Sequence, residues 1–424
     1  MSRNSRLVFL TIFLFFSGAF AKEKAQEDLY IMMALDSEKE QKSLESFEYY
    51  NKLYETTQKE NYLKKAIYYS YKAKQFDVMY SLSKKALEAF PQYEEYYYQQ
   101  IIISLVSQNK TTQALKEAKK LLKKYQNATS YEIMANVFYA RKEYDNSSKY
   151  YESAYTLNQN ETTLIKLTTV LYTYLNQKDV ALAYLETYLQ TKGCTKAVCD
   201  KLMLIYQEQG NVDGMLSILN RMYLKYKGNP ELKKTTLLIQ NLIVSLLENK
   251  DIKEAIKFLE ETNIDQAKLI NLYYQDRQLK KALMMTKKLY KETKNPDLLG
   301  KIAMYRFELA DDKRAVMKNV IANFELALSS GINNASYQNY YGYLLIDFNI
   351  DIKKGVSLVQ SALKTAPNNV AYLDSLAWGY YKQGKCKEAL KIMEKVIRVT
   401  GLKDKEINYH WKTINDCKKE NKKK

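Results

Sequence analysis

The fold is decided by residues 371–401, which read AYLDSLAWGYYKQGKCKEALKIMEKVIRVTG. On each side of Gly384, apolar residues recur at intervals of three and four positions, a spacing that places them on one face of a helix. Because neither helix can bury its apolar face alone, we expect the two to pack against each other as a helix-turn-helix hairpin. The first face consists of Leu373, Leu376, Ala377 and Tyr380, and the second of Ala389, Met393 and Val396.

Hairpins of this kind recur along most of the chain. Two helices approach closely where a side chain is short or compact, so we expect one such residue in each second helix. Candidates lie at Ser46, Met79, Ala114, Ser147, Ala181, Met215, Ala255, Ala282, Val320, Gly355 and Ala389. Seven of the ten intervals between them measure 33 to 35 residues, which predicts about eleven units stacked in a solenoid.

The 371–401 stretch resembles the tetratricopeptide repeat (TPR), a unit of about 34 residues. A second unit has Ala135, Phe138, Tyr144, Ser147, Tyr151 and Ala154 in matching order. The resemblance implies an all-α superhelix, a TPR-like solenoid of about eleven helix-turn-helix units with a C-terminal capping helix over residues 406–417. Residues 334–401 look like the terminal repeats of secreted bacterial TPR proteins.

Residues 1–21 are typical of a secretory signal peptide. Arg3 and Arg6 precede an apolar run over residues 7–16, and Ala19 and Ala21 form a small-x-small cleavage site. An uncleaved N-terminal anchor is the alternative, but the run is shorter than the roughly 20 residues that span a bilayer. We therefore expect a periplasmic or secreted protein that does not span the membrane when mature.

The remaining chain divides into four predicted segments. Residues 28–227 form an N-terminal TPR-like array, residues 228–331 irregular repeats, residues 332–417 the C-terminal repeats with their capping helix, and residues 418–424 a lysine-rich tail. The irregular intervals between compact residues, 40, 27 and 38, belong to the second of these segments. Because solenoid curvature depends on a constant rotation per repeat, we expect a change of direction there.

The net charge of +18 raises the question of a nucleic-acid partner. The basic residues are mostly lysines spread among Glu and Asp along the chain, and export separates the protein from intracellular nucleic acid. We therefore expect no nucleic-acid partner. A solvated lysine-rich face is favoured, and attraction to an anionic envelope surface is the alternative.

Four cysteines in an exported chain suggest disulfides. Cys386 begins the second helix of its unit, and Cys417 lies near the end of the next, antiparallel helix, so we expect these two to be bonded. Such a bond would close a loop of about 30 residues and stabilise the cap by roughly 3 to 4 kcal/mol in the chain-entropy model. Cys194 and Cys199 would form a second, local bond, and four free thiols are the alternative.

Catalytic and metal-binding patterns are missing from the sequence. The single histidine, His410, cannot build a His-based triad or a His-rich metal cluster, and no glycine-rich phosphate loop occurs. CTKAVC lacks the paired spacing of a zinc site. We predict a protein that is not an enzyme and has no cofactor or metal, in which His410 packs at the position of Leu376.

In the TPR family the first helix of each unit lines a concave groove that receives a peptide or helix from a partner. The resemblance therefore implies a partner-binding surface formed by Asp374, Trp378, Tyr381 and Lys382 in the last unit, Asn339, Tyr343 and Asp347 in the unit before, and Glu132, Asn136 and Tyr139 further upstream. The alternative is that these aromatic side chains only fill the space between units.

These observations favour a non-enzymatic periplasmic scaffold that binds protein partners, mainly envelope components, through its concave groove. Envelope assembly, secretion or a surface machine such as the flagellar motor would use such a scaffold. The alternative is an accessory protein that presents its groove to a cell-wall glycan or an anionic envelope polymer.

Overall fold

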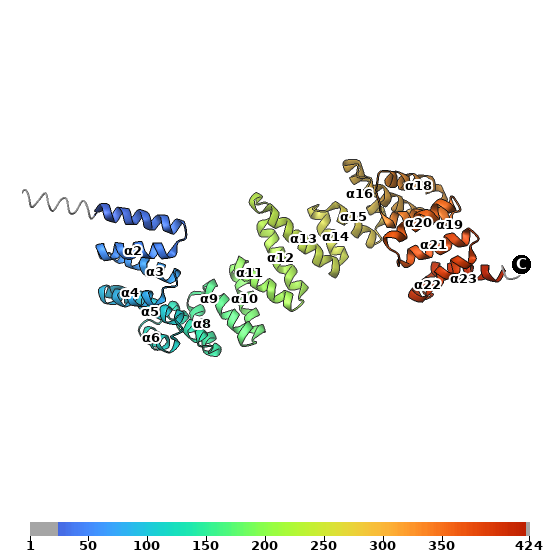
Figure 1. The fold of residues 1–424 in the computed structure, drawn as a ribbon. Coiled ribbons are helices and arrows are strands. Elements are labelled where there is room, and N and C mark those ends of the chain that lie inside the picture. Colours follow the sequence, from blue (N-terminus) through green and yellow to red (C-terminus); the bar gives the residue numbers. More distant parts are fainter. Residues whose placement is uncertain (1–23, 421–424) are drawn as a thin grey trace, which may run out of the picture. The chain divides into compact units, whose positions relative to one another are not determined.

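A computed structural model describes residues 24–420, with side chains described for residues 24–417. The predicted signal peptide and the end of the lysine-rich tail lie outside the described residues. The contacts between its residues divide the chain after residue 222 into two compact units. Within the described residues all regular structure is helical, and consecutive helices pair as antiparallel hairpins (Figure 1). This confirms the predicted all-α array of helix-turn-helix units.

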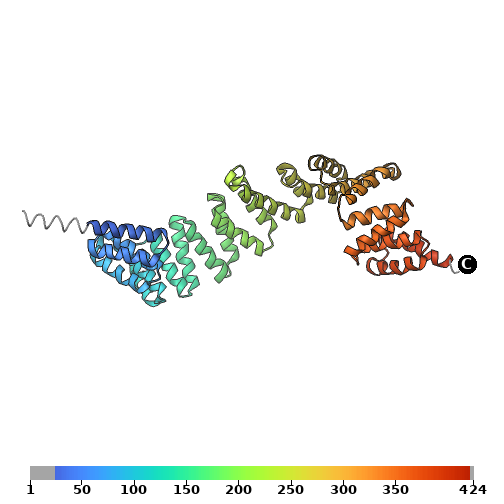
Figure 2. The same ribbon diagram turned by 45° about the horizontal axis from the view of Figure 1, so that its top comes forward.

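Unit 1 begins with a helix over residues 24–39, which lies alongside the helices that follow it (Figure 2). Its other elements are α2 (Ser43–Thr57), α3 (Glu60–Lys72), α4 (Phe76–Ala89), η1 (Pro91–Tyr93), α5 (Glu94–Ser107), α6 (Thr111–Lys124), α7 (Ala128–Ala140), α8 (Tyr144–Asn158), α9 (Glu161–Thr169), the π-helical turn η2 (Val170–Tyr174), α10 (Lys178–Lys192), α11 (Lys196–Glu208) and most of α12 (Val212–Tyr226).

Unit 2 continues from the end of α12 through the C-terminal repeats. Its elements are η3 (Pro230–Leu232), α13 (Lys233–Lys250), α14 (Ile252–Thr262), α15 (Gln266–Gln275), α16 (Leu279–Thr293), α17 (Asp297–Leu309), α18 (Lys313–Ser329), α19 (Ala335–Asp347), α20 (Ile352–Thr365), α21 (Val370–Lys382), α22 (Cys386–Thr400) and α23 (Lys405–Glu420). Among the described residues, eleven helix pairs thus precede α23.

The turn inside many hairpins closes in the same way. After Asn109 and Gly384, whose φ angles are 59° and 75°, the next N–H bonds back to the first helix. Lys385 N, for example, donates to the carbonyl oxygen of Tyr380 over 2.9 Å. A left-handed residue followed by this bond satisfies the last carbonyl groups of the first helix and reverses the chain. Asn109 and Gly384 suit these positions, because asparagine and glycine adopt the left-handed conformation more readily than other residues.

All eleven predicted compact residues lie on second helices, and ten of them are buried. The prediction is wrong at Met215, which is only partly buried. In that hairpin the close approach occurs one residue earlier, because a Cβ atom on Gly214 would lie 2.6 Å from the ring of Tyr206.

Unequal helix lengths explain the first two irregular intervals, of 40 and 27 residues. Helix α13 has 18 residues, whereas α14 and α15 have 11 and 10, so the interval lengthens and then shortens. Helix α18 is also long, with 17 residues. The third interval, of 38, arises because Val320 is the eighth residue of α18, whereas each of the other ten compact residues is the fourth residue of its helix. The change of direction expected in this segment stays a prediction.

Tyrosines link neighbouring repeats. The hydroxyl of Tyr97 donates to Glu60, 37 positions earlier, over 2.8 Å, and the hydroxyl of Tyr62 donates to Glu27, 35 positions earlier, over 2.7 Å. A tyrosine can bury its ring between two units while its hydroxyl reaches a polar partner in the neighbouring repeat. Part of the chain's 39 tyrosines therefore serves contacts between units.

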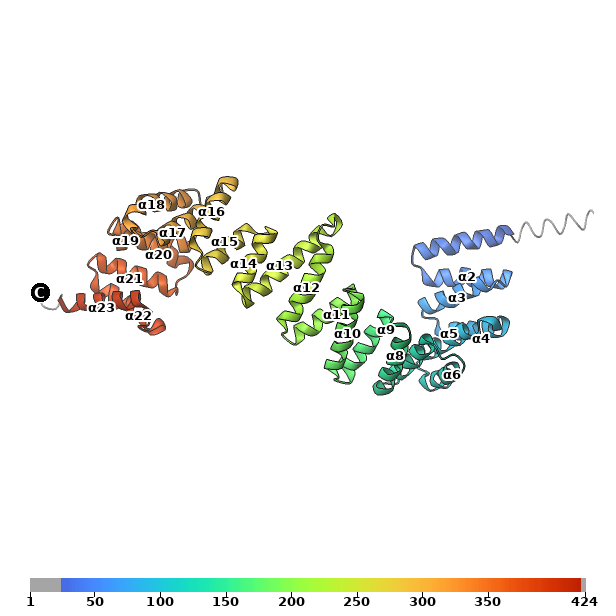
Figure 3. The same cartoon turned by 180° about the vertical axis from the view of Figure 1, so that it is seen from behind.

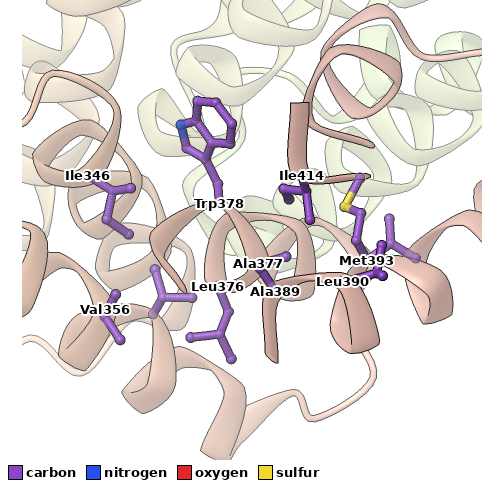
Figure 4. Packing of buried hydrophobic residues seen from close by; sticks show 11 residues of the cluster. Ile346, Val356, Leu376, Ala377, Trp378, Ala389, Leu390, Met393 and Ile414 are labelled. Carbon is purple, nitrogen blue, oxygen red and sulfur yellow. The ribbon is translucent and has the colours of Figure 1, made fainter. Parts of the chain in front are cut away.

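The C-terminal helix α23 covers the last hairpin. Its Ile414 is fully buried in one apolar cluster with Met393 and Val396 of α22 (Figure 4). Trp378 points to the opposite side of α21 from Leu376 (Figure 4). The predicted capping role of the C-terminal helix is confirmed.

Candidate functional site

First helices of unit 2 surround a hollow of about 440 Å³. Helices α17, α19 and α21, together with α23, contribute its walls; their labels lie near one another in Figure 3. The lining residues are Phe307, Asn339, Tyr340, Tyr343, Leu344, Ala371, Asp374, Ser375, Asp404, Glu406 and Ile407. Among the described residues, no second helix contributes to the hollow, so it lies on the face that the TPR resemblance assigned to partners.

Three of the predicted partner-binding residues, Asn339, Tyr343 and Asp374, line this hollow. Tyr343 is held in place by α23, because its hydroxyl donates a hydrogen bond to the carboxylate of Glu406. Asp404 in turn fixes the start of α23 by accepting hydrogen bonds from the backbone N–H groups of Glu406 and Ile407, over 2.9 and 3.0 Å.

The hollow is acidic. Asp374 is 7% exposed, and its carboxylate accepts a hydrogen bond from Nδ1 of His410 over 3.0 Å. Burial, the hydrogen bond to Glu406 and the nearby carboxylates all raise the pKa of Tyr343, which keeps its hydroxyl neutral. Oδ1 of Asn339 is buried without a hydrogen-bond donor among the described residues.

The sequence predicted that the ring of Trp378 faces an open groove, but in the structure this ring is covered. Trp378 is 3% exposed, and its ring stacks on the imidazole of His410 with centroids 4.2 Å apart. Its Nε1 donates to Oδ1 of Asp347 over 3.0 Å. The reason is the capping helix, which covers this face of α21 and brings His410 onto the indole.

Tyr381 and Lys382 lie beside this indole and not in the hollow. The ring of Tyr381 stacks on Trp378 at 5.0 Å, and Nζ of Lys382 lies 5.0 Å from the indole centroid. Binding of a partner by Trp378, Tyr381 or Lys382 thus remains a proposal, and it would require contact at the edge of this stack.

Sequence reasoning missed the contribution of α23. His410 is the sixth residue of α23, as Ser375 is of α21, so it corresponds to Ser375 and not to Leu376. Glu406 is the second residue, as Ala371 is of α21. Since Ala371 and Ser375 both line the hollow, alignment of the helix starts would have placed Glu406 and His410 on the same face.

Unit 1 has a separate hollow of about 370 Å³. Its walls come from the first helices α3, α5 and α7 and include the predicted Asn136 and Tyr139 together with Tyr71. Tyr71 and Tyr139 are 44% and 38% exposed. Glu132 lies outside this hollow and forms a salt bridge of 2.6 Å with Lys166, one repeat further on.

The four cysteines are joined as the sequence predicted. Cys386 is bonded to Cys417, with Cα atoms 6.0 Å apart, and Cys194 to Cys199, with Cα atoms 5.6 Å apart. The first bond connects α22 to α23 and so fastens the helix that completes the acidic hollow. Within residues 24–420, no helix combines the length and apolar character needed to cross a bilayer.

No family model matches the chain, and no curated protein matches its sequence. Similar solved structures include Naa15/Naa10 bound to HypK-THB, at 15% identity and a TM-score of 0.37, covering 86% of this chain and 67% of that one. Yeast Tom70 is similar at 12% identity and a TM-score of 0.35, covering 95% and 96%. A tetratricopeptide repeat protein from Parabacteroides merdae is similar at 14% identity and a TM-score of 0.32, covering 66% and 97%. At these TM-scores the similarities carry no argument about function.

Proposed function

We propose that this chain is a non-enzymatic scaffold that binds extended segments of partner proteins on the faces of its first helices. The observation that carries the proposal is that the hollows of about 370 and 440 Å³ are lined by first helices, in unit 2 with α23 added, and combine tyrosines with polar side chains. A third hollow, of about 380 Å³, lies between the second helices α8 and α10. Rigid aromatic rings beside a few polar groups are typical of surfaces that recognise proteins.

The scaffold would act in the periplasm or outside the cell, on components of the envelope. Two disulfides support an oxidising compartment, because cytosolic thiols are kept reduced. The signal-like residues 1–21 support the same compartment. Envelope assembly, secretion or a surface machine such as the flagellar motor remain the processes that we propose.

Binding of an anionic envelope polymer is the weaker proposal for the hollow of unit 2. Asp374, Asp404 and Glu406 line it, and their negative charges would repel phosphate or carboxylate groups of such a polymer.

Crosslinking in intact cells tests the scaffold proposal. The double variant Tyr71→Ala, Tyr139→Ala lacks two of the tyrosine rings that line the hollow of about 370 Å³ in unit 1. It should lose crosslinked proteins that the parent chain retains. Tyr68→Ala is the matched control, because Tyr68 is 47% exposed on the same helix as Tyr71 and does not line the hollow. Retention of every crosslinked protein by the double variant would contradict binding at this hollow.

A further inference from the structure

The hollow of unit 2 is acidic in a chain whose net charge is +18. Asp374, Asp404 and Glu406 line it, and no lysine or arginine does among the residues that the structure describes. A concave site lined by charges of one sign concentrates ligands of the opposite sign.

Two acceptors in the hollow have capacity for another donor. Oδ1 of Asn339 is buried and has no hydrogen-bond partner within the described part of the chain. Within the part of the chain that the structure describes, both oxygens of the buried Asp374 face one N–H group, that of His410, although a carboxylate can accept about four hydrogen bonds. Buried acceptors of this kind are costly unless a donor reaches them, and a charged donor forms the stronger bond.

Aromatic rings complete the walls. Burial, more than any other effect, raises the pKa of Tyr340 and of Tyr343, so both phenols stay neutral. The face of a neutral aromatic ring attracts a cation within about 6 Å. Phe307 already shows this preference, since Nζ of Lys313 lies 5.0 Å from its centroid while donating to the carbonyl oxygens of Phe307 and Glu308.

We propose that this hollow binds a basic side chain, lysine or arginine, of a partner protein segment that lies along the first helices. The inference rests on the scaffold function proposed above. The ammonium or guanidinium group donates to Asp374, Glu406 and Oδ1 of Asn339, and its aliphatic stem lies against Tyr340 and Tyr343. A volume of about 440 Å³ is within the usual range for a binding pocket and accepts such a side chain with part of its backbone.

A positional-scanning array of ten-residue synthetic peptides, probed with the oxidised full-length protein, tests the proposal. Peptides with a fixed Lys or Arg should be retained about tenfold better than those with Gln at the same position. The best peptide is then titrated in its basic form and its Gln form against the parent and against Glu406→Gln. This variant keeps an acceptor for Tyr343 and removes the charge; Glu394→Gln, on the exposed side of α22, is the matched control.

The preference for the basic peptide should fall by about tenfold in Glu406→Gln and stay unchanged in Glu394→Gln. Fluorescence of Trp378 and Trp411 verifies that α21 and α23 remain folded in both variants. Peptides retained with no preference for Lys or Arg, or a preference that survives Glu406→Gln, would overturn this inference and leave the scaffold proposal in place. Retention of no peptide at all would overturn both.

Discussion

Helices α19 and α20 touch through their backbones, and this contact yields a prediction with a definite sign. A Cβ atom on Gly355 would lie 2.6 Å from the carbonyl oxygen of Gly342 and 2.7 Å from Cγ1 of Ile346. In the next hairpin the corresponding pair is Ala377 and Ala389, at the same places in their helices. Because the added Cβ atom would overlap these two atoms of α19, we expect Gly355→Ala to force α19 and α20 apart.

The expected magnitude comes from two opposing effects. Alanine in a helix is favoured over glycine by about 1 kcal/mol, which alone would stabilise the variant. Overpacking of a dense interface costs about 1 to 3 kcal/mol, and the upper end applies here because the obstructing atom is backbone and cannot rotate away. The net expectation is a loss of about 2 kcal/mol in the free energy of unfolding of the C-terminal repeats.

Urea titration followed by tryptophan fluorescence measures this loss locally, because both tryptophans of the chain, Trp378 and Trp411, lie in α21 and α23. Ser357→Ala, at an exposed position of α20, is the matched control and should change stability by only a few tenths of a kcal/mol. A Gly355→Ala variant as stable as the parent, or more stable, would refute the close-contact reasoning.

Three further predictions concern the same repeats. Cys417→Ser, which removes the bond between α22 and α23, should lower the free energy of unfolding by roughly 3 to 4 kcal/mol in the chain-entropy model, and reductant should destabilise the parent to the same extent in the fluorescence assay. Lys354 lowers the pKa of Glu325 through a side-chain hydrogen bond, so the pair contributes stability above the unfolded value near 4.5 and loses it as pH falls through the lowered pKa; Glu325→Gln should cost less than about 1 kcal/mol at pH 7 and progressively less in acid. Trp378→Phe keeps an aromatic ring against α23 but leaves Asp347 without its donor, and urea titration followed by circular dichroism should give a loss of about 1 to 3 kcal/mol.

The repeat architecture follows from local features of the sequence. Each hairpin has its own apolar faces and its own compact residue, and most have a left-handed residue in the turn, so a window of about 34 residues contains what is needed to predict it. The disulfide partners followed from the same period, because Cys386 and Cys417 stand at adjoining ends of consecutive helices.

The acidic hollow could not be predicted in the same way. Its walls come from four helices between residues 307 and 407, and its character depends on Glu406, which lies in the capping helix and not in a repeat. Trp378 was misjudged for a related reason: its exposure depends on how closely α23 covers α21, which a pattern confined to one unit does not contain. The error at Met215 has a different cause. Its neighbour Gly214 is also small, and which of the two lies at the close approach depends on which side of α12 meets Tyr206.

The hydrogen bonds from tyrosine to glutamate one repeat away make each unit's opening depend on its immediate neighbour. In such a one-dimensional array, unfolding begins most easily at an end, where a unit has only one neighbour. The C-terminal end is fastened by the bond between Cys386 and Cys417, whereas the helix over residues 24–39 is held by packing, by ion pairs and by hydrogen bonds such as that from Tyr62 to Glu27. Backbone amides should therefore exchange with solvent first in the N-terminal repeat, and in the C-terminal repeats only after the disulfide is reduced.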